Sequence, residues 1–320
     1  MSSLSLLEEK INSAQSILIL THINPDGDAL GSIISMKCAI KQKFNKEADT
    51  LFIGKYPDIY EFLPCRRDLI SIENFNSDKI YDVAIALDVA SKDRMANIEK
   101  TFNSAKYKVN IDHHKTNNNY ATFNFVDGNA SSTGEVLYGL FNDLNIEITK
   151  DIAVSLYTSI LTDTGCFKYN STTPNAMKIC SELLSKGVDP SKTAQLIYGN
   201  KPKSMVLLNA YAISNAKFLS NEKIAYTVVS LDDLERFKAD SDHTEGIVEH
   251  LKEIDSVEVA ILFKELKNGF TKVSFRSKNV DVAKISSKFD GGGHTNAAGC
   301  TVKKPMNIAI EKIIEELKDI

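Results

Sequence analysis

The sequence of 320 residues is short of positive charge and of paired cysteines, and each shortage excludes a class of protein. Lys and Arg number 38 against 42 Asp and Glu, so the net charge is −4. A protein that coats nucleic acid needs a broad excess of Lys and Arg, so we expect no long duplex partner, although a small basic pocket stays possible. The five cysteines form no CxxC pair, which argues against a zinc ribbon and fits a reducing compartment.

Long apolar runs and a basic leader are also missing. No apolar run approaches the roughly 20 residues that span a bilayer. The first residues, MSSLSLLEEKINSAQ, lack a basic region followed by an apolar core, so we expect no signal peptide. These absences predict a cytoplasmic protein with no membrane partner.

The length predicts two domains, because one core seldom absorbs 320 residues. The segment YGNKPKS (198–204) interrupts the regular pattern with Gly, Asn and Pro. We therefore expect a first domain over 1–197, a linker over 198–205 and a second, smaller α/β domain over 206–320. We also expect the active site in the cleft between the two domains.

Strands and helices alternate in the first domain. Apolar runs at 16–22, 81–88 and 108–114 are typical of buried strands, and helical or loop segments separate them. This alternation predicts an α/β fold with a doubly wound parallel sheet. Ser132 and Glu135 predict a capping box for the helix that follows.

The second domain is expected to begin with a helix over 205–219. Strands should follow within 223–231, 256–266 and 270–277. A glycine-rich segment, FDGGGHTNAAGC, then precedes a closing helix from about Asn307.

Potential metal ligands follow every strand that we predict for the first domain, and another Asp ends an apolar helix at residue 163. In an open α/β sheet, ligands bind beyond the carboxyl ends of the strands. We therefore expect these side chains to meet in one crevice. They are His22, Asp26, Asp28, Asp88, Asp112, His113, His114 and Asp163.

Each group alone has a simpler explanation. Asp26-Gly27 is a common turn, Asp28 could cap a helix, and Asp88 could bond to a turn. All these explanations would have to hold at once at converging strand ends, so we favour a metal site. A cation between the carboxylates would cancel their repulsion. Oxygen and nitrogen donors without Cys suit Mn²⁺ best, with Mg²⁺ or Co²⁺ as alternatives, and two ions sharing a carboxylate can activate water for attack on phosphorus.

Five segments together resemble a known family. THINPDGDALGS, ALDVAS, NIDHHKTN and TDTGCFKYNSTTPNA are similar, in order, to the four motifs of the DHH phosphoesterase superfamily. GGGHTNAAGC resembles the signature of the DHH-associated second domain. The match runs from about residue 16 to 301, and it is most similar to the NrnA-type oligoribonucleases (nano-RNases) and pAp phosphatases.

The resemblance implies roles for the cluster. One metal ion would be held by His22, Asp26 and Asp88, with Asp88 bridging to a second ion. The second ion would also take Asp28, His113 and Asp163. Asp112 would orient the neighbouring imidazole, and His114 would face the substrate phosphate. We thus expect the catalytic residues to be Asp88, Asp112, His113 and His114.

Substrate contacts are expected from both domains. The backbone N–H groups of Gly291, Gly292 and Gly293 could bind a phosphate, with His294 as a further donor. Arg276 is the strongest basic candidate, although a run of charge is usually solvated surface. Arg94 is a weaker one. Lys168 stands where relatives often carry Arg, which keeps the charge but loses bidentate binding.

The sequence favours a metal-dependent phosphoesterase that cleaves short RNA or linear dinucleotides to mononucleotides and pAp to AMP. A RecJ-like exonuclease is an alternative, but those enzymes usually carry extra domains. A manganese pyrophosphatase shares the four DHH motifs but has a different second domain. A non-catalytic nucleotide sensor is disfavoured because every expected ligand position is filled. A homodimer is possible.

Overall fold

The computed structural model of the chain describes residues 3–318, which divide into two compact units. The first unit ends at Asn200 and the second begins at Lys201. Within the described residues, no helix is both long and apolar enough to cross a membrane.

The first unit is built on a six-stranded sheet with the order β3-β2-β1-β4-β5-β6, and every neighbouring pair is parallel. The chain leaves the central strand β1 towards one edge and returns at β4 to build the other, so the predicted doubly wound α/β fold is confirmed. The strands are β1 (Ile17–Ile23), β2 (Asp49–Ile53), β3 (Leu69–Ser71), β4 (Val83–Leu87), β5 (Tyr107–Asp112) and β6 (Phe123–Val126).

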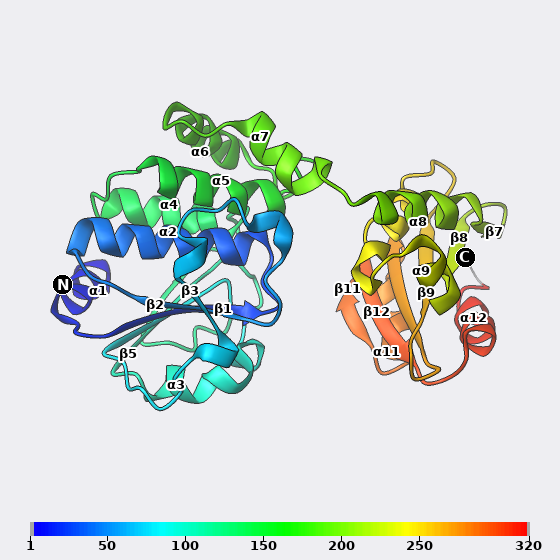
Figure 1. Cartoon of the computed structure of the whole chain (residues 1–320), viewed down its shortest axis with the longest axis horizontal. Helices are drawn as coiled ribbons and strands as arrows, with labels where there is room; N and C mark the ends of the chain where they lie inside the picture. The colour runs from blue at the N-terminus through cyan, green and yellow to red at the C-terminus, as the bar shows by residue number, and fades with distance from the viewer. Residues whose placement is uncertain (1–2, 319–320) are drawn as a thin grey trace. The chain divides into compact units, whose positions relative to one another are not determined.

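Both faces of this sheet are covered (Figure 1). In β1, Ile17 and Ile19 pack into one core and Leu18 and Leu20 into the other, which explains the unbroken apolar run. Figure 1 shows α2, α4 and α5 on one face and α3 on the other. The helices of this unit are α1 (Ser3–Ser13), α2 (Gly27–Phe44), α3 (Glu99–Ser104), α4 (Thr133–Asp143), α5 (Lys150–Asp163), α6 (Pro174–Ser185) and α7 (Pro190–Ala194).

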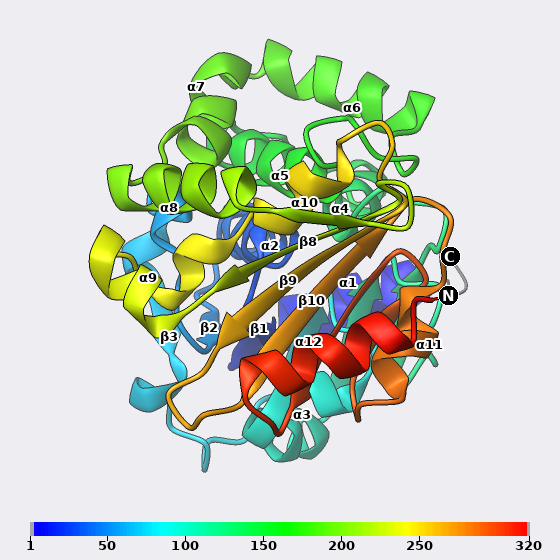
Figure 2. The same cartoon turned by 90° about the vertical axis from the view of Figure 1, so that its right-hand side faces the viewer.

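The second unit has a mixed six-stranded sheet with the order β11-β12-β10-β9-β8-β7. Only the β8–β9 pair is parallel among the described strands of this sheet. Figure 2 shows α12 lying across this sheet. The elements are α8 (Lys203–Ser214), β7 (Lys217–Leu219), β8 (Ile224–Val229), α9 (Leu231–Phe237), α10 (Ile247–Lys252), β9 (Val259–Glu265), β10 (Thr271–Ser277), α11 (Val282–Ser287), β11 (Gly292–His294), β12 (Ala297–Val302) and α12 (Met306–Glu315).

Two local predictions were wrong. The helix expected over 205–219 ends at Ser214, because residues 217–219 pair with β8 as an edge strand. The capping box before α4 is incomplete. The Ser132 hydroxyl accepts the N–H of Glu135, but the Glu135 carboxylate accepts from Ser131 and from Asn175 instead of from Ser132.

Asp82 connects the starts of β1, β4 and β5 through hydrogen bonds. One carboxylate oxygen accepts the N–H groups of Gln15 (2.8 Å) and Ser16 (3.1 Å), and the other accepts from Lys106 (2.6 Å). The hydrogen bond from Lys106, followed by that from Gln15, lowers the pKa of Asp82 to about 2. The ionised carboxylate therefore stabilises the fold above its unfolded pKa of about 4, and this stability is lost as the pH falls towards 2.

We expect Asp82→Asn to lower the free energy of unfolding by about 1 kcal/mol at pH 7, because a charged acceptor is lost. Urea titrations at several pH values would measure it. The difference from the unaltered protein should vanish between about pH 5 and pH 2. The exposed Asp78→Asn serves as the control, and a difference that grew on acidification would contradict this role for Asp82.

Candidate metal centre and active site

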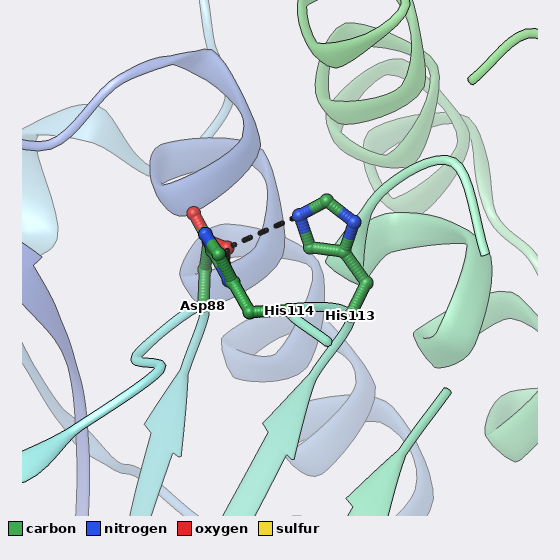
Figure 3. Close-up of side chains that lie close together, drawn as sticks. All are labelled: Asp88, His113 and His114. Atoms are coloured by element: carbon green, nitrogen blue, oxygen red, sulfur yellow. Dashed lines mark ion pairs between the residues drawn. The ribbon is translucent and has the colours of Figure 1, made fainter. Parts of the chain in front are cut away.

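The polar side chains of the first unit gather at the carboxyl ends of β1, β4 and β5. His22 is the penultimate residue of β1, Asp88 follows β4, and His113 and His114 follow β5. The sheet order reverses between β1 and β4, which is where a doubly wound sheet opens a crevice. Figure 3 shows Asp88, His113 and His114 coming from the ends of the neighbouring strands β4 and β5.

A cavity of about 140 Å³ lies at this point. Three residues that we expected at the site do not line this cavity. Asp28 and Asp112 are buried, and Lys168 is exposed. The residues that line the cavity are His22, Asp26, Asp88, Ala90, Arg94, His113, His114 and Asp163.

Asp88 lies at the centre of the cluster. Its Oδ2 lies 3.4 Å from His22 Nε2, whereas its Oδ1 lies 3.8 Å from His113 Nε2 and 3.6 Å from His114 Nδ1. Asp88 has a φ of +59°, a left-handed conformation that costs free energy for a residue with a Cβ and often marks a functional site. Each oxygen of this carboxylate thus faces a different group of donors.

Two further groups of donors meet around Asp88. On one side, His22 Nε2 lies 4.0 Å from Asp26 Oδ1. On the other, His113 Nε2 lies 3.6 Å from Asp28 Oδ2 and 3.4 Å from Asp163 Oδ2. The potential ligand atoms of His22, Asp26 and Asp88 all lie within 4.8 Å of one another, and so do those of Asp28, His113 and Asp163.

Without a cation, the surroundings of Asp28 and Asp163 disfavour ionisation of their carboxyl groups. Burial, and then the charges of Asp88 and Asp163, raise the pKa of Asp28 well above its usual value. Burial also raises the pKa of Asp163 to about 6. Burial alone would raise the pKa of Asp88 too, but the neighbouring histidines, His22 first, outweigh it and the pKa is lowered. Divalent cations would let all these carboxylates ionise together, so the donor set fits a metal centre.

Asp28 is held by partners that the sequence did not reveal. Its carboxylate accepts from the N–H of Thr133 (2.8 Å) and from the hydroxyl of Ser159 (2.5 Å), and weaker bonds come from Gly134 and Ser32. The Thr133 hydroxyl also donates to Asp88 Oδ1 at 3.1 Å. The start of α4 therefore positions two of the central carboxylates. The segment SSTGE predicted only a helix start, and nothing in it indicated these partners.

A hydrogen-bonded chain holds His114. Its Nδ1 donates to Asp112 Oδ1 at 2.8 Å, and the Asn117 amide donates to Asp112 Oδ2 at 2.6 Å. Asn110 and Tyr120 extend this network, and both donate to the carbonyl of Val89, next to Asp88. The hydrogen bond to Asp112 raises the pKa of His114 to about 9. The imidazole is therefore fixed in orientation.

The residues that we expected to contact substrate in the second unit lie on its sheet. Arg276 of β10, Ala297 of β12 and His294 of β11 are in direct cross-strand register, so their side chains share one face of the sheet. The Arg276 guanidinium pairs with Glu249 at 2.9 Å. His294 and Gly293 line an open hollow of about 740 Å³ together with Lys284 and Asn296.

Two glycines of the glycine-rich segment belong to an edge strand, β11. Gly292 and Gly293 pair with β12, and the N–H of Gly291 donates to the carbonyl of Ser286. A phosphate would therefore meet the unpaired edge of β11, and the N–H of Gly291 already has a partner.

The chain matches two domain families. Residues 16–160 match the DHH family, N-terminal domain, and residues 221–320 match the DHHA1 domain. It is 29% identical over 320 residues to the probable bifunctional oligoribonuclease and PAP phosphatase NrnA of Streptococcus mutans, covering 100% of this chain and 99% of that protein. It is also 29% identical over 310 residues to the bifunctional oligoribonuclease and PAP phosphatase NrnA of Thermus thermophilus, covering 95% and 89%.

A solved structure has the same fold. The crystal structure of an exopolyphosphatase-related protein from Bacteroides fragilis gives a TM-score of 0.93 at 26% identity, over 99% of this chain and 96% of that chain. Family matches, relatives and fold all agree with the motifs. The chain therefore belongs to the DHH family of metal-dependent phosphoesterases, with a DHH domain followed by a DHHA1 domain, and the family predicted from its motifs is confirmed.

Proposed function

We propose that this phosphoesterase hydrolyses short RNA and linear dinucleotides to mononucleotides, and pAp to AMP. The relatives from Streptococcus mutans and Thermus thermophilus carry both activities in their names. The observation that carries the proposal is the placement of Asp88, whose two carboxylate oxygens face separate donor groups. Such a carboxylate can be shared by two cations, as two-metal phosphoesterases require.

The proposal includes two divalent ions, with Mn²⁺ as the preferred metal because the donors are oxygen and imidazole nitrogen. When bound, the ions would supply activated water and neutralise charge on the phosphate. His22 and Asp26 would hold one ion and Asp88 would be shared. The other ion would take Asp28, Asp88, His113 and Asp163.

The remaining residues of the cavity act on the substrate. We assign His114 as the hydrogen-bond donor to the substrate phosphate, since its Nδ1 is held by Asp112 and its ring lines the cavity. Asp112 is thereby a positioning residue, buried and bonded to His114 and Asn117. Arg94 lines the same cavity and supplies a further positive charge for phosphate.

We also propose that the second unit binds the substrate. Arg276 and His294 share one face of the sheet, and the glycine edge (Gly291, Gly292 and Gly293) lies beside them. Arg276 would have to exchange Glu249 for a phosphate. Lys168 is exposed and does not line the cavity. Its proposed contact with substrate therefore rests on the family motif alone.

A metal-dependent assay with four substrates tests this function. We expect turnover of pApA and pAp with Mn²⁺, little turnover of pyrophosphate, and complete loss on chelation. A 24-nucleotide RNA should be cleaved more slowly than pApA, because at a net charge of −4 added phosphates bring little attraction. Each of the other activities would show as a different ranking of these substrates.

Rates that rise with RNA length would favour a RecJ-like exonuclease, and preference for pyrophosphate would favour a pyrophosphatase. Nucleotide binding without turnover of any of the four, with both metals bound, would favour a sensor. Any of these results would overturn the proposed substrates.

A further inference from the structure

Tyr169 is a large aromatic residue left mostly in solvent, on the segment that follows Asp163 of the candidate metal centre. Its side chain is 59% exposed, although it follows Asp163, a lining residue of the cavity, by only six positions. Its ring lies directly on Gly165, where an added Cβ would come within 2.4 Å of the ring carbon Cζ. One part of the ring is therefore fixed against the backbone while the rest faces solvent.

The segment that carries Tyr169 has an unusual backbone. Gly165, Cys166 and Phe167 have φ values of +56°, +58° and +64°, three left-handed residues in succession. Residues with a Cβ seldom adopt this conformation, and then usually singly. The fold compensates with local bonds, because the N–H groups of Lys168 and Tyr169 both donate to the carbonyl of Thr164 at 3.0 Å.

The left-handed turn separates two aromatic rings. Phe167 points back to the protein and packs against Tyr157, with ring centres 6.3 Å apart. Tyr169 is directed outward instead. Two residues apart, Phe167 thus packs inward while Tyr169 leaves most of its ring available to a ligand.

A second partly exposed tyrosine, Tyr198, is anchored to the end of α5. The Tyr198 hydroxyl donates to the carbonyl of Leu161 at 3.3 Å, and its side chain is 39% exposed. Burial, followed by the nearby charges of Cys166, Tyr169 and Asp163, raises the pKa of Tyr198. Tyr198 is thus bonded to α5 two residues before Asp163, a lining residue of the cavity.

We propose that Tyr169 forms a stacking surface for the base of a nucleotide whose phosphate lies at the candidate metal centre. Only one sugar separates base from phosphate, so the base must rest near the rim of the cavity. The Tyr169 ring packs on Gly165, which follows the lining residue Asp163 by two positions. Every nucleobase has a π face, so stacking on an exposed tyrosine gives affinity without selecting a sequence. Tyr169 would thereby distinguish nucleotides from phosphate compounds that have no base.

This inference rests on the proposed function, and its test uses binding rather than turnover. The affinities of AMP and of ribose 5-phosphate, which lacks the base, are measured by calorimetry with metal present. Tyr169→Leu should weaken AMP binding about 5- to 150-fold, as expected for one lost base–aromatic stack. Binding of ribose 5-phosphate should change less than about twofold, because its phosphate contacts remain.

Two variants serve as controls. Tyr169→Phe keeps the ring and should bind AMP nearly as the unaltered chain does. Phe218→Leu removes another exposed ring, 43% exposed on β7 of the second unit, and should change neither affinity. Equal losses for AMP and ribose 5-phosphate in Tyr169→Leu, or no loss for AMP, would overturn the stacking role.

Failure of the proposed function looks different. If the unaltered protein turned over neither pApA nor pAp, those substrates would be excluded whatever Tyr169 does. If it turned over both while Tyr169→Leu kept full AMP affinity, only the stacking surface would be excluded.

Discussion

Replacing Asp88 by Asn is expected to remove phosphoesterase turnover while the protein stays folded. Asn keeps the size of the side chain and tolerates the left-handed backbone found at this position, where φ is +59°. It removes the negative charge that faces His22 on one side and His113 on the other. Because the proposed function assigns Asp88 to both metal positions, we expect both ions to bind more weakly.

The loss should exceed the roughly 10- to 100-fold that removal of an outer partner of a metal site costs. Turnover of pApA and metal content after dialysis would be measured together, with thermal unfolding as the check on folding. Asp143→Asn is the matched control, since Asp143 is exposed at the end of α4. A folded Asp88→Asn protein with near-normal turnover and two bound metals would refute the shared carboxylate.

The strand ends were predictable because they follow from local pattern and one general rule. Apolar runs before His22 and Asp88 indicated buried strands, and parallel strands bring their carboxyl ends to one edge. The strands β2, β3 and β6 were not expected from the sequence. β3 and β6 are only three and four residues long, and pairing with the longer neighbours β2 and β5 supplies the order that their own residues do not.

The hydrogen-bond partners of Asp28 could not be predicted from the sequence, for a different reason. Thr133 and Gly134 reach Asp28 across 105 and 106 positions of sequence, and Ser159 does so across 131. Ser, Thr and Gly are common at helix starts for local reasons, so they carry no signal of a distant carboxylate. The glycine run was similarly ambiguous, because glycine suits an anion-binding loop and a closely paired edge strand alike.

Gly134→Ala is expected to damage the metal centre from outside it. A Cβ at this position would lie 2.0 Å from the Ser159 hydroxyl oxygen and 2.7 Å from the Ser159 Cβ. The serine must therefore move, and with it goes the hydroxyl that donates to the buried Asp28 carboxylate at 2.5 Å. We expect turnover to fall about 10- to 100-fold and stability to fall by about 1–3 kcal/mol.

A second glycine of α4, Gly139, has room for a side chain and serves as the comparison for Gly134. Gly139 is exposed in the interior of α4, and an added Cβ would meet nothing within 4 Å. Gly139→Ala should therefore raise stability by about 0.5–1 kcal/mol, because alanine loses less backbone entropy in a helix, and leave turnover unchanged. Thermal unfolding and pApA turnover of both variants give the comparison. If the two substitutions had the same effect, the change in helix propensity would account for both, and the contact between α4 and Ser159 would have no part in holding Asp28. Opposite effects would show that Gly134→Ala acts by displacing the Ser159 hydroxyl, which donates to Asp28.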